Sequence, residues 1–294
     1  MTFVICTESG LLEQKSLLLC SSIRKFGGHF RGAPIVSYSP RLRHHPSAQT
    51  LKKLEDLEVV TILGGLNKKY SDYPLANKIF AGAEAEKRLQ SERLVFLDSD
   101  TIIVNEPVKL LLEPDHQVGA VPVWNTDIGS TGPEDPNDEY WMKLYALLGV
   151  EKEVYIRPLS KPSRPIRGYW NSGVISARRS CGVFNNWLDN FDKCWSRRIF
   201  PPISYFTEEA TFAGTILAMF PNLIQELPRS YNYPLMRFRS NKGLTSLNQA
   251  TIFHYSRLLK RDIIQVREFF RMWFSNCKLT EKHLWLKEEL KALV

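Results

Sequence analysis

Apolar and polar positions alternate in blocks along the first hundred residues, and the blocks predict strands and helices in turn. The short apolar runs typical of strands lie at residues 2–6, 34–39, 59–63 and 94–97. The stretches with apolar residues at helical spacing are 11–26, 47–57 and 74–89. This alternation predicts an α/β fold with a mostly parallel, mixed sheet flanked by helices.

The pattern becomes less regular after residue 118. Further strands are expected at residues 118–123, 172–177, 222–227 and 251–254, and further helices at 139–148, 182–196 and 208–219. Between them, residues 124–168 are rich in Pro, Asp, Glu and Gly. A long irregular segment inside a compact domain is often a lid or a binding loop, so we expect a lid or acceptor-binding region there.

Two carboxylates stand where the buried strand LVFL ends, at Asp98 and Asp100. Residues two apart in a strand share a face, so both carboxylates can converge at the carboxyl end of the sheet, where open α/β sheets bind ligands. Oxygen donors in this arrangement suit Mg²⁺ or Mn²⁺ carrying substrate phosphates. The alternative is that both aspartates only mark a turn after a core strand.

The C-terminal residues 263–294 predict two amphipathic helices with a basic surplus. Of the net charge of +8, residues 230–294 contribute +7, with 12 Lys and Arg against 5 Asp and Glu. Basic helices with Trp and Phe suit an anionic membrane surface. The open alternatives are that their apolar stripes pack on the domain, or that the charge serves nucleic-acid binding, although no nucleic-acid motif is present.

Length and composition favour one large domain, residues 1–262, followed by the C-terminal helices. The chain has 294 residues, 44% of them hydrophobic, which allows a sizeable core. Its five cysteines are odd in number and scattered, which indicates reduced thiols. No apolar stretch reaches the length of a membrane span and no basic leader precedes the first apolar run, so we expect a cytoplasmic protein, with peripheral membrane contact through the C-terminal helices as an option.

Three short motifs, in this order, resemble a known family. They are Asp98-Ser99-Asp100, Asn171-Ser172-Gly173, and His254 followed six residues later by Lys260. Together they resemble the GT-A glycosyltransferases, most closely the retaining family 8 enzymes, which include glycogenin and the lipopolysaccharide galactosyltransferases. The similarity spans residues 2 to 262. It implies a nucleotide-sugar donor and a carbohydrate or glycolipid acceptor.

The resemblance implies a metal site and a diphosphate site. Asp98, Asp100 and His254 would bind Mn²⁺ or Mg²⁺, with Asp98 and Ser99 also near the donor nucleotide. Lys260 would contact the diphosphate. The family's glycine between the His and the Lys is Arg257 here, and Arg261 with Asp262 replaces its Pro-Trp. Arg257 either supplies a bidentate phosphate contact or is a solvated surface residue.

Further donor contacts are expected from the amino-terminal half. Lys78, twenty residues before Asp98, matches a basic residue that the family places over the donor, although a lysine on a helix is often only solvated. Thr7 and Glu8 end the first strand, where the base and ribose are expected. No glycine-rich loop follows that strand, so the phosphates must be neutralised by metal and lysine.

The sugar end of the site is expected at two later segments. Asn171, Ser172 and Gly173 match the family segment that faces the donor sugar, or else they form an ordinary turn. Glu208 and Glu209 stand in place of the family's Asp-Gln near the transferred sugar, or else they only favour a helix start. Asn171, Glu209 and Lys260 are the predicted catalytic residues.

The sequence therefore predicts transfer of a hexosyl group from a nucleotide-diphosphate sugar, with UDP as the expected nucleotide, to a hydroxyl group of a carbohydrate or lipid-linked acceptor. The resemblance implies retention, whereas inversion would need a general base such as Glu208, Glu209 or Asp127. A phosphatase of the haloacid dehalogenase type also carries an aspartate pair after an apolar strand, but its motif opens the domain. A sugar nucleotidyltransferase would need a glycine-rich loop after the first strand.

Overall fold

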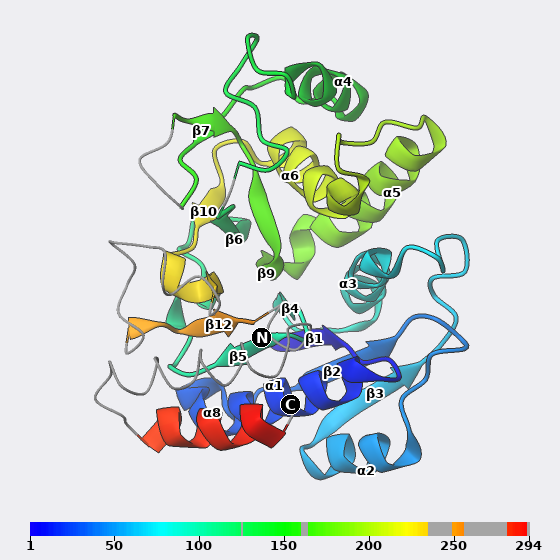
Figure 1. The fold of residues 1–294 in the computed structure, drawn as a ribbon, viewed down its shortest axis with the longest axis vertical. Helices are drawn as coiled ribbons and strands as arrows, with labels where there is room; N and C mark the ends of the chain where they lie inside the picture. Colours follow the sequence, from blue (N-terminus) through cyan, green and yellow to red (C-terminus); the bar gives the residue numbers. More distant parts are fainter. Residues whose placement is uncertain (125, 160–163, 235–248, 256–280, 293–294) are drawn as a thin grey trace.

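A computed structural model describes residues 1–124, 126–159, 164–234, 249–255 and 281–292. Its centre is a seven-stranded sheet in the order β10-β6-β9-β4-β1-β2-β3 (Figure 1). The strands of this sheet are β1 (Thr2–Cys6), β2 (Ile35–Ser39), β3 (Val59–Leu63), β4 (Arg93–Leu97), β6 (Val118–Pro122), β9 (Trp170–Arg178) and β10 (Ile224–Glu226). Its α/β architecture confirms the predicted fold class.

The pairing of the strands is parallel except around β9. β1 pairs in parallel with β2 and β4, β2 with β3, and β10 with β6, while β9 is antiparallel to both β4 and β6. A second sheet has the order β11-β12-β5, formed by β11 (Tyr233–Pro234), β12 (Ile252–His254) and β5 (Thr101–Ile103). The carboxyl end of β4 leads directly into β5, so the two sheets meet there.

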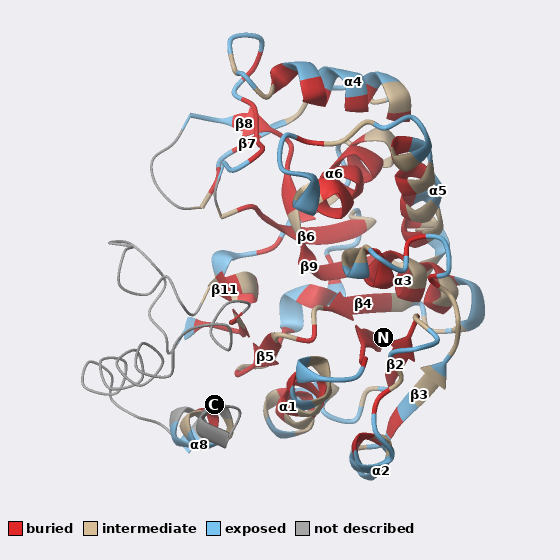
Figure 2. Cartoon of the chain, turned by 45° about the vertical axis from the view of Figure 1, so that its right-hand side comes forward, coloured by how far each residue is buried: buried red, intermediate tan, exposed pale blue. Residues whose placement is uncertain are grey.

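Helices cover both faces of the central sheet. They are α1 (Leu11–Phe26), α2 (Ala48–Asp56), α3 (Asn77–Arg88), α4 (Asp138–Leu148), α5 (Val183–Ser196) and α6 (Thr207–Met219). Alternate residues of β1 supply the two cores: Val4 and Cys6 join the side of α3 to α6, whereas Phe3 and Ile5 join the side of α1 and α2. The central strands are buried almost throughout (Figure 2).

The chain reverses at the acidic pair instead of continuing as one strand. β4 ends at Leu97, and the N–H of Thr101 donates to the carbonyl of Asp98 at 3.0 Å, which closes a turn before β5. Asp98 and Asp100 therefore lie on a turn. The prediction that they converge is confirmed, but the strand geometry given as its reason is wrong, because the turn brings the carboxylates together.

The irregular region contains more structure than its sequence pattern indicates. Besides α4, it forms a small sheet of β7 (Tyr155–Ile156) and β8 (Ile166–Arg167). The buried Arg167 side chain donates from Nε to Asp138 at 2.7 Å, which ties β8 to the start of α4. A lid or acceptor role for residues 124–168 stays a prediction.

The second predicted C-terminal helix is α8 (Glu281–Ala292), which lies beside α1 (Figure 1). The rings of Trp285 and Phe26 are 5.1 Å apart, edge to face, and Leu286 is fully buried. This part of α8 packs on the domain. The other predicted helix falls within residues 256–280, outside the described residues, so contact with an anionic membrane stays a prediction.

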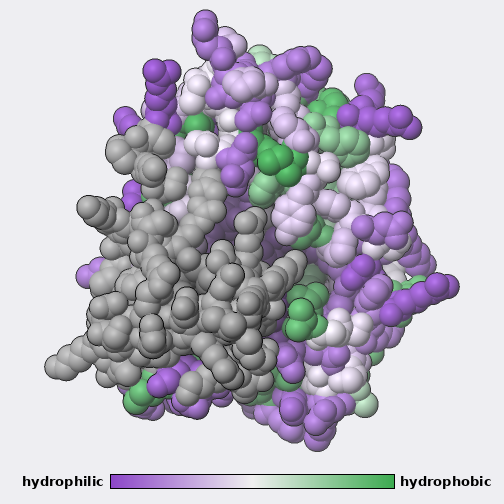
Figure 3. All heavy atoms as spheres, viewed as in Figure 1, coloured by the Kyte–Doolittle hydropathy of each residue, from purple (hydrophilic) through white to green (hydrophobic). Residues whose placement is uncertain are grey.

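The described surface is mainly hydrophilic on the face shown in Figure 3, where apolar residues form separate areas. None of the helices in the described part of the chain combines the length and apolar character that a membrane crossing requires. Among the described cysteines, Cys6, Cys20, Cys181 and Cys194 are free thiols, as the sequence predicted.

Candidate active site

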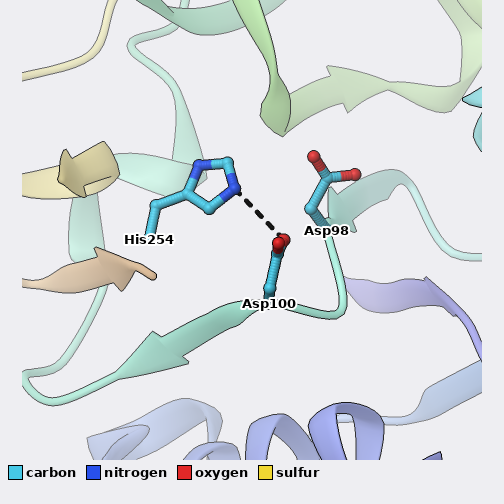
Figure 4. Close-up of side chains that lie close together, drawn as sticks. All are labelled: Asp98, Asp100 and His254. Carbon is cyan, nitrogen blue, oxygen red and sulfur yellow. Dashed lines mark hydrogen bonds and ion pairs between the residues drawn. The ribbon is translucent and has the colours of Figure 1, made fainter. Parts of the chain in front are cut away.

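Asp98, Asp100 and His254 come together where the two sheets meet (Figure 4). One ligand atom from each residue lies within 4.8 Å of those of the other two. His254 Nε2 is 3.1 Å from Asp100 Oδ1. The three side chains are each 15–22% exposed, so the cluster is open to a ligand.

Local structure explains why residues 154 positions apart meet. β12 is antiparallel to β5, with His254 opposite Thr101, which places the imidazole beside the turn that carries Asp100. Gly173 on β9 allows the close approach, because a Cβ there would lie 2.9 Å from Asp98 Oδ2 and 3.0 Å from His254 Cε1. Any larger residue at this position would push into the cluster.

A buried lysine connects Asp98 to Glu208 and Ser172. Lys78 Nζ lies 2.8 Å from Asp98 Oδ1, 3.4 Å from Glu208 Oε1 and 3.3 Å from Ser172 Oγ. Burial would lower the pKa of Lys78, but the charges of Asp98 and Glu208 outweigh it and raise the pKa. Lys78 is therefore a charged group in the centre of the site, rather than the solvated alternative.

A second lysine, from α1, lies on the other side of the acidic pair. Lys15 Nζ is 3.5 Å from Asp100 Oδ2, and the side chain is 8% exposed. Burial would raise the pKa of Asp100, yet the charges of His254, Lys15 and Lys78 hold it well below its usual range. Burial would lower the pKa of His254, but Asp100 outweighs that effect and raises it. Asp100 is thus ionised over the physiological range.

Glu208 and Glu209 lie at the start of α6, and both are buried. Burial, with the neighbouring Glu208 charge as the next cause, raises the pKa of Glu209 to about 7. Burial also raises the pKa of Glu208, against the lowering effect of Lys78. The Ser172 hydroxyl donates to Glu208 Oε2 at 2.8 Å. The structure thus places both glutamates inside the same cluster as Lys78.

Hydrogen bonds connect Glu209 to the metal-ligand cluster. Tyr169 Oη donates to Glu209 Oε1, and Asn171 Nδ2 donates to Glu209 Oε2 at 2.6 Å. Asn171 Oδ1 accepts from Asn232 Nδ2 at 2.9 Å. Asn232 Oδ1 in turn lies 2.7 Å from His254 Nδ1. The predicted residues Asn171, Glu209 and His254 are therefore parts of one network.

Three predicted nucleotide contacts have partners within the protein. Thr7 is buried and its hydroxyl accepts from Ser37 Oγ at 2.6 Å. Glu8 is buried against Arg41, whose Nη2 donates to Glu8 Oε2 at 2.6 Å. Ser99 donates its hydroxyl to the Cys6 carbonyl, which holds the turn against β1. Their roles in donor binding stay predictions.

Two predicted diphosphate contacts, Arg257 and Lys260, lie outside the described residues. Four further residues contact the predicted site residues and were not predicted from the sequence: Lys15, Arg41, Tyr169 and Asn232. Lys15 gave a signal, because it interrupts the buried face of α1 that Leu18 and Leu19 continue. Asn232 gave none, because an asparagine two residues before a proline is typical of any turn.

The cluster fits a divalent cation. Two carboxylates and one imidazole are the ligands that Mn²⁺ and Mg²⁺ accept, and His254 has one ring nitrogen facing Asp100 and the other facing Asn232. Ligands about 2.1 Å from a Mg²⁺ ion lie roughly 3–4 Å apart, so small side-chain shifts suffice to surround one. Asp98, Asp100 and His254 are the residues that would hold it.

The fold is shared with solved glycosyltransferases. WbbM, titled a bifunctional glycosyltransferase, aligns over 98% of this chain with 14% identity and a TM-score of 0.57. This chain covers only 51% of WbbM. An active-site mutant of LgtC aligns over 96% of this chain and 98% of its own, with 11% identity and a TM-score of 0.55. LgtC, titled a galactosyltransferase, is also solved with donor and acceptor sugar analogues, and that structure gives a TM-score of 0.54.

The architecture is therefore the GT-A fold, and the predicted resemblance to family 8 is confirmed. A family model described as the Rhodobacterales glycosyltransferase domain matches residues 3–200. The chain belongs to this glycosyltransferase family and is an enzyme. No curated protein matches its sequence significantly. The family assignment favours a glycosyltransferase over the phosphatase alternative, whereas the absence of nucleic-acid binding stays a prediction.

Proposed function

We propose that this glycosyltransferase transfers a hexosyl group from a nucleotide-diphosphate sugar, with UDP as the nucleotide, to a hydroxyl group of a carbohydrate or lipid-linked acceptor, in a metal-dependent reaction with retention. The observation that carries the proposal is the convergence of Asp98, Asp100 and His254 beside Lys78. LgtC, which shares the fold, is titled a galactosyltransferase with donor and acceptor sugar analogues, and this supports the substrate class.

Asp98, Asp100 and His254 would hold Mn²⁺ or Mg²⁺ at the donor diphosphate. When bound, such a cation supplies a Lewis acid that stabilises negative charge on the leaving nucleoside diphosphate. Lys15 and Lys78 add two ammonium groups on opposite sides of the aspartates. Preorganised positive charge at the leaving group is worth more in a partly buried site than in water.

The sugar end of the site consists of Asn171, Ser172 and Glu209. Asn171 and Glu209 are hydrogen-bonded to each other and held further by Asn232 and Tyr169, so they can orient sugar hydroxyls without a large entropic cost. Arg257 and Lys260 are proposed diphosphate contacts on the strength of the sequence resemblance alone. Contact with an anionic membrane through the basic C-terminal residues 263–294 would bring the enzyme to a glycolipid acceptor.

The proposal is tested with the full chain, Mn²⁺ and a panel of nucleotide-diphosphate sugars, measuring release of the nucleoside diphosphate and the change in melting temperature. We expect one UDP-sugar to raise the melting temperature in the presence of Mn²⁺ and to be turned over. Asp100→Asn should abolish both effects, while Asp189→Asn, an exposed aspartate on α5, serves as the matched control. Equal turnover with and without a metal chelator would contradict the proposal.

A further inference from the structure

The hydrogen-bond network behind His254 determines which of its ring nitrogens faces the cation site. An imidazole has two nitrogens, and a neutral ring can offer a metal only the nitrogen that carries no proton. His254 Nε2 faces Asp100 and Nδ1 faces Asn232. Which nitrogen keeps the proton depends on what Asn232 presents to the ring.

The orientation of the Asn171 side-chain amide follows from its contact with the backbone N–H of Gly173. The N–H of Gly173 can only donate, and it lies 2.8 Å from Asn171 Oδ1. The side-chain oxygen of Asn171 must therefore face Gly173. The NH₂ group of Asn171 then faces Glu209 Oε2, which accepts at 2.6 Å. The Gly173 N–H alone fixes the orientation of the Asn171 amide, because a backbone N–H can only donate.

The orientation of the Asn232 side-chain amide follows from that of Asn171. Asn171 Oδ1 is an acceptor, so the group of Asn232 that lies 2.9 Å from it must be the NH₂. The oxygen of Asn232 then faces His254 Nδ1 at 2.7 Å. An amide oxygen can only accept, so Nδ1 must carry a proton. A neutral His254 in this network has its lone pair on Nε2, toward Asp100.

We propose that Asn232 is a positioning residue that keeps the proton of His254 on Nδ1 and so presents Nε2 to the divalent cation. The proposal rests on the metal site of the proposed function. Asn232 ends the 3₁₀ turn Arg229–Asn232, directly before β11, which pairs in parallel with β12. This pairing places the Asn232 amide behind the His254 ring, at the side away from Asp100.

The affinity of the full chain for Mn²⁺ alone tests the proposal, with free Mn²⁺ measured by electron paramagnetic resonance. Loss of an outer partner of a metal-ligating histidine weakens metal binding about 10- to 100-fold, and we expect this for Asn232→Ala. Asn232→Asp keeps an acceptor for Nδ1 and should recover most of the affinity. If Asn232→Ala binds Mn²⁺ about as tightly as the unchanged protein, or if both variants lose affinity equally, the proposal is wrong.

A matched control separates positioning from folding. Asn190 is a buried amide on α5 that donates to Thr215 Oγ1 of α6 at 3.1 Å, and this pair is separate from the hydrogen bonds that link Glu209, Asn171, Asn232 and His254. We expect Asn190→Ala to lower the melting temperature and leave Mn²⁺ affinity unchanged. A parallel loss of Mn²⁺ affinity in Asn190→Ala and Asn232→Ala would mean that the loss reflects folding only, and would overturn the proposal.

Nitrogen-15 spectra of histidine-labelled protein report the tautomer of His254 directly. They use the unchanged protein, so the result does not depend on whether a variant folds. With saturating Mg²⁺, the His254 ring should show a protonated Nδ1 and an unprotonated Nε2, and the opposite pattern would contradict the proposal. If the unchanged protein binds neither cation, the metal-dependent function fails instead. The metal-free spectrum then still tests the network, because a slowly exchanging Nδ1 proton is expected and its absence would refute the assignment.

Discussion

The site contains two acidic pairs whose environments differ. Asp98 and Asp100 lie on a turn that is open to ligands, with Lys15, Lys78 and His254 around them. Glu208 and Glu209 are buried at the start of α6 and lie side by side. Surrounding positive charge lowers the pKa of Asp100 against the effect of burial, whereas burial and mutual repulsion raise the pKa of Glu209 to about 7.

The comparison shows that the surroundings, rather than the residue type, decide what a carboxylate can do. Asp100 stays ionised, and the two aspartates together are suited to a cation. Glu209 holds a proton more readily than an exposed glutamate and is suited to hydrogen bonding with neutral hydroxyl groups. Lys78 connects the pairs, because its ammonium contacts both Asp98 and Glu208.

The largest effect is expected from the aspartate pair. Asp100→Asn keeps the size of the side chain but removes a charge and a metal ligand, so Mn²⁺-dependent sugar transfer should fall about 10³-fold, equivalent to about 4 kcal/mol. Steady-state kinetics with a UDP-sugar measures this. Asp189→Asn on the outer face of α5 should retain full activity. A loss below about tenfold for Asp100→Asn would show that this carboxylate does not bind the metal.

The next largest effect is expected on the melting temperature when Lys78, which contacts both acidic pairs, loses its charge. Lys78→Met leaves Asp98 and Glu208 without their shared cation, and loss of one partner of a buried ion pair costs about 3–5 kcal/mol. We expect a melting temperature about 10 °C lower by calorimetry. Lys87→Met, on the exposed side of the same helix, should change little. The double variant Lys78→Met, Glu208→Gln should recover part of the loss, and no recovery would contradict the coupling.

A pH profile sharpens the comparison at Glu209. Its folded-state pKa of about 7 exceeds the reference value of 4.5, so the folded state binds this proton more tightly than the unfolded state. Stability of the metal-free protein should therefore fall as pH rises from about 4.5 to about 7 and should not change further from this cause. Glu209→Gln should melt about 4 °C higher at pH 8 and equally near pH 4. A difference that is independent of pH would refute this account.

The smallest effect is expected at Lys15. Its ammonium lies 3.5 Å from Asp100 Oδ2 and competes with a cation for that oxygen. Lys15→Gln should bind Mn²⁺ alone about threefold more tightly and bind UDP with Mn²⁺ more weakly, because the diphosphate loses a nearby positive charge. Calorimetric titrations measure both. Lys25→Gln on the same helix is the matched control, and weaker Mn²⁺ binding by Lys15→Gln would contradict the prediction.

Much of the fold could be predicted from the sequence because its elements are locally encoded. The helix expected at residues 11–26 is α1 with the same bounds, and the strands expected at 2–6 and 59–63 are β1 and β3. The turn at the acidic pair was predicted only as an alternative, and β5 after it was missed, because the apolar residues on both sides of the pair resemble one strand. Only the pairing of β5 with β12 separates them, and a single sequence does not show such a long-range contact.

The candidate site was predictable where a motif is short and continuous. Asp98, Asp100 and His254, the predicted metal ligands, lie in one cluster. Asn171 and Glu209, two of the predicted catalytic residues, are hydrogen-bonded to each other. The residues that link them could not be found in this way. Asn232 reaches His254 only because β11 pairs with β12, and Lys15 reaches Asp100 across 85 positions.

A crystal structure of the full chain with Mn²⁺ and UDP tests the central claim most directly, through the anomalous scattering of manganese. We predict one strong peak bonded to Asp98, Asp100 and His254 Nε2 and to the diphosphate oxygens of UDP. A peak elsewhere, or UDP bound beside these residues with no manganese at the three side chains, would contradict the account.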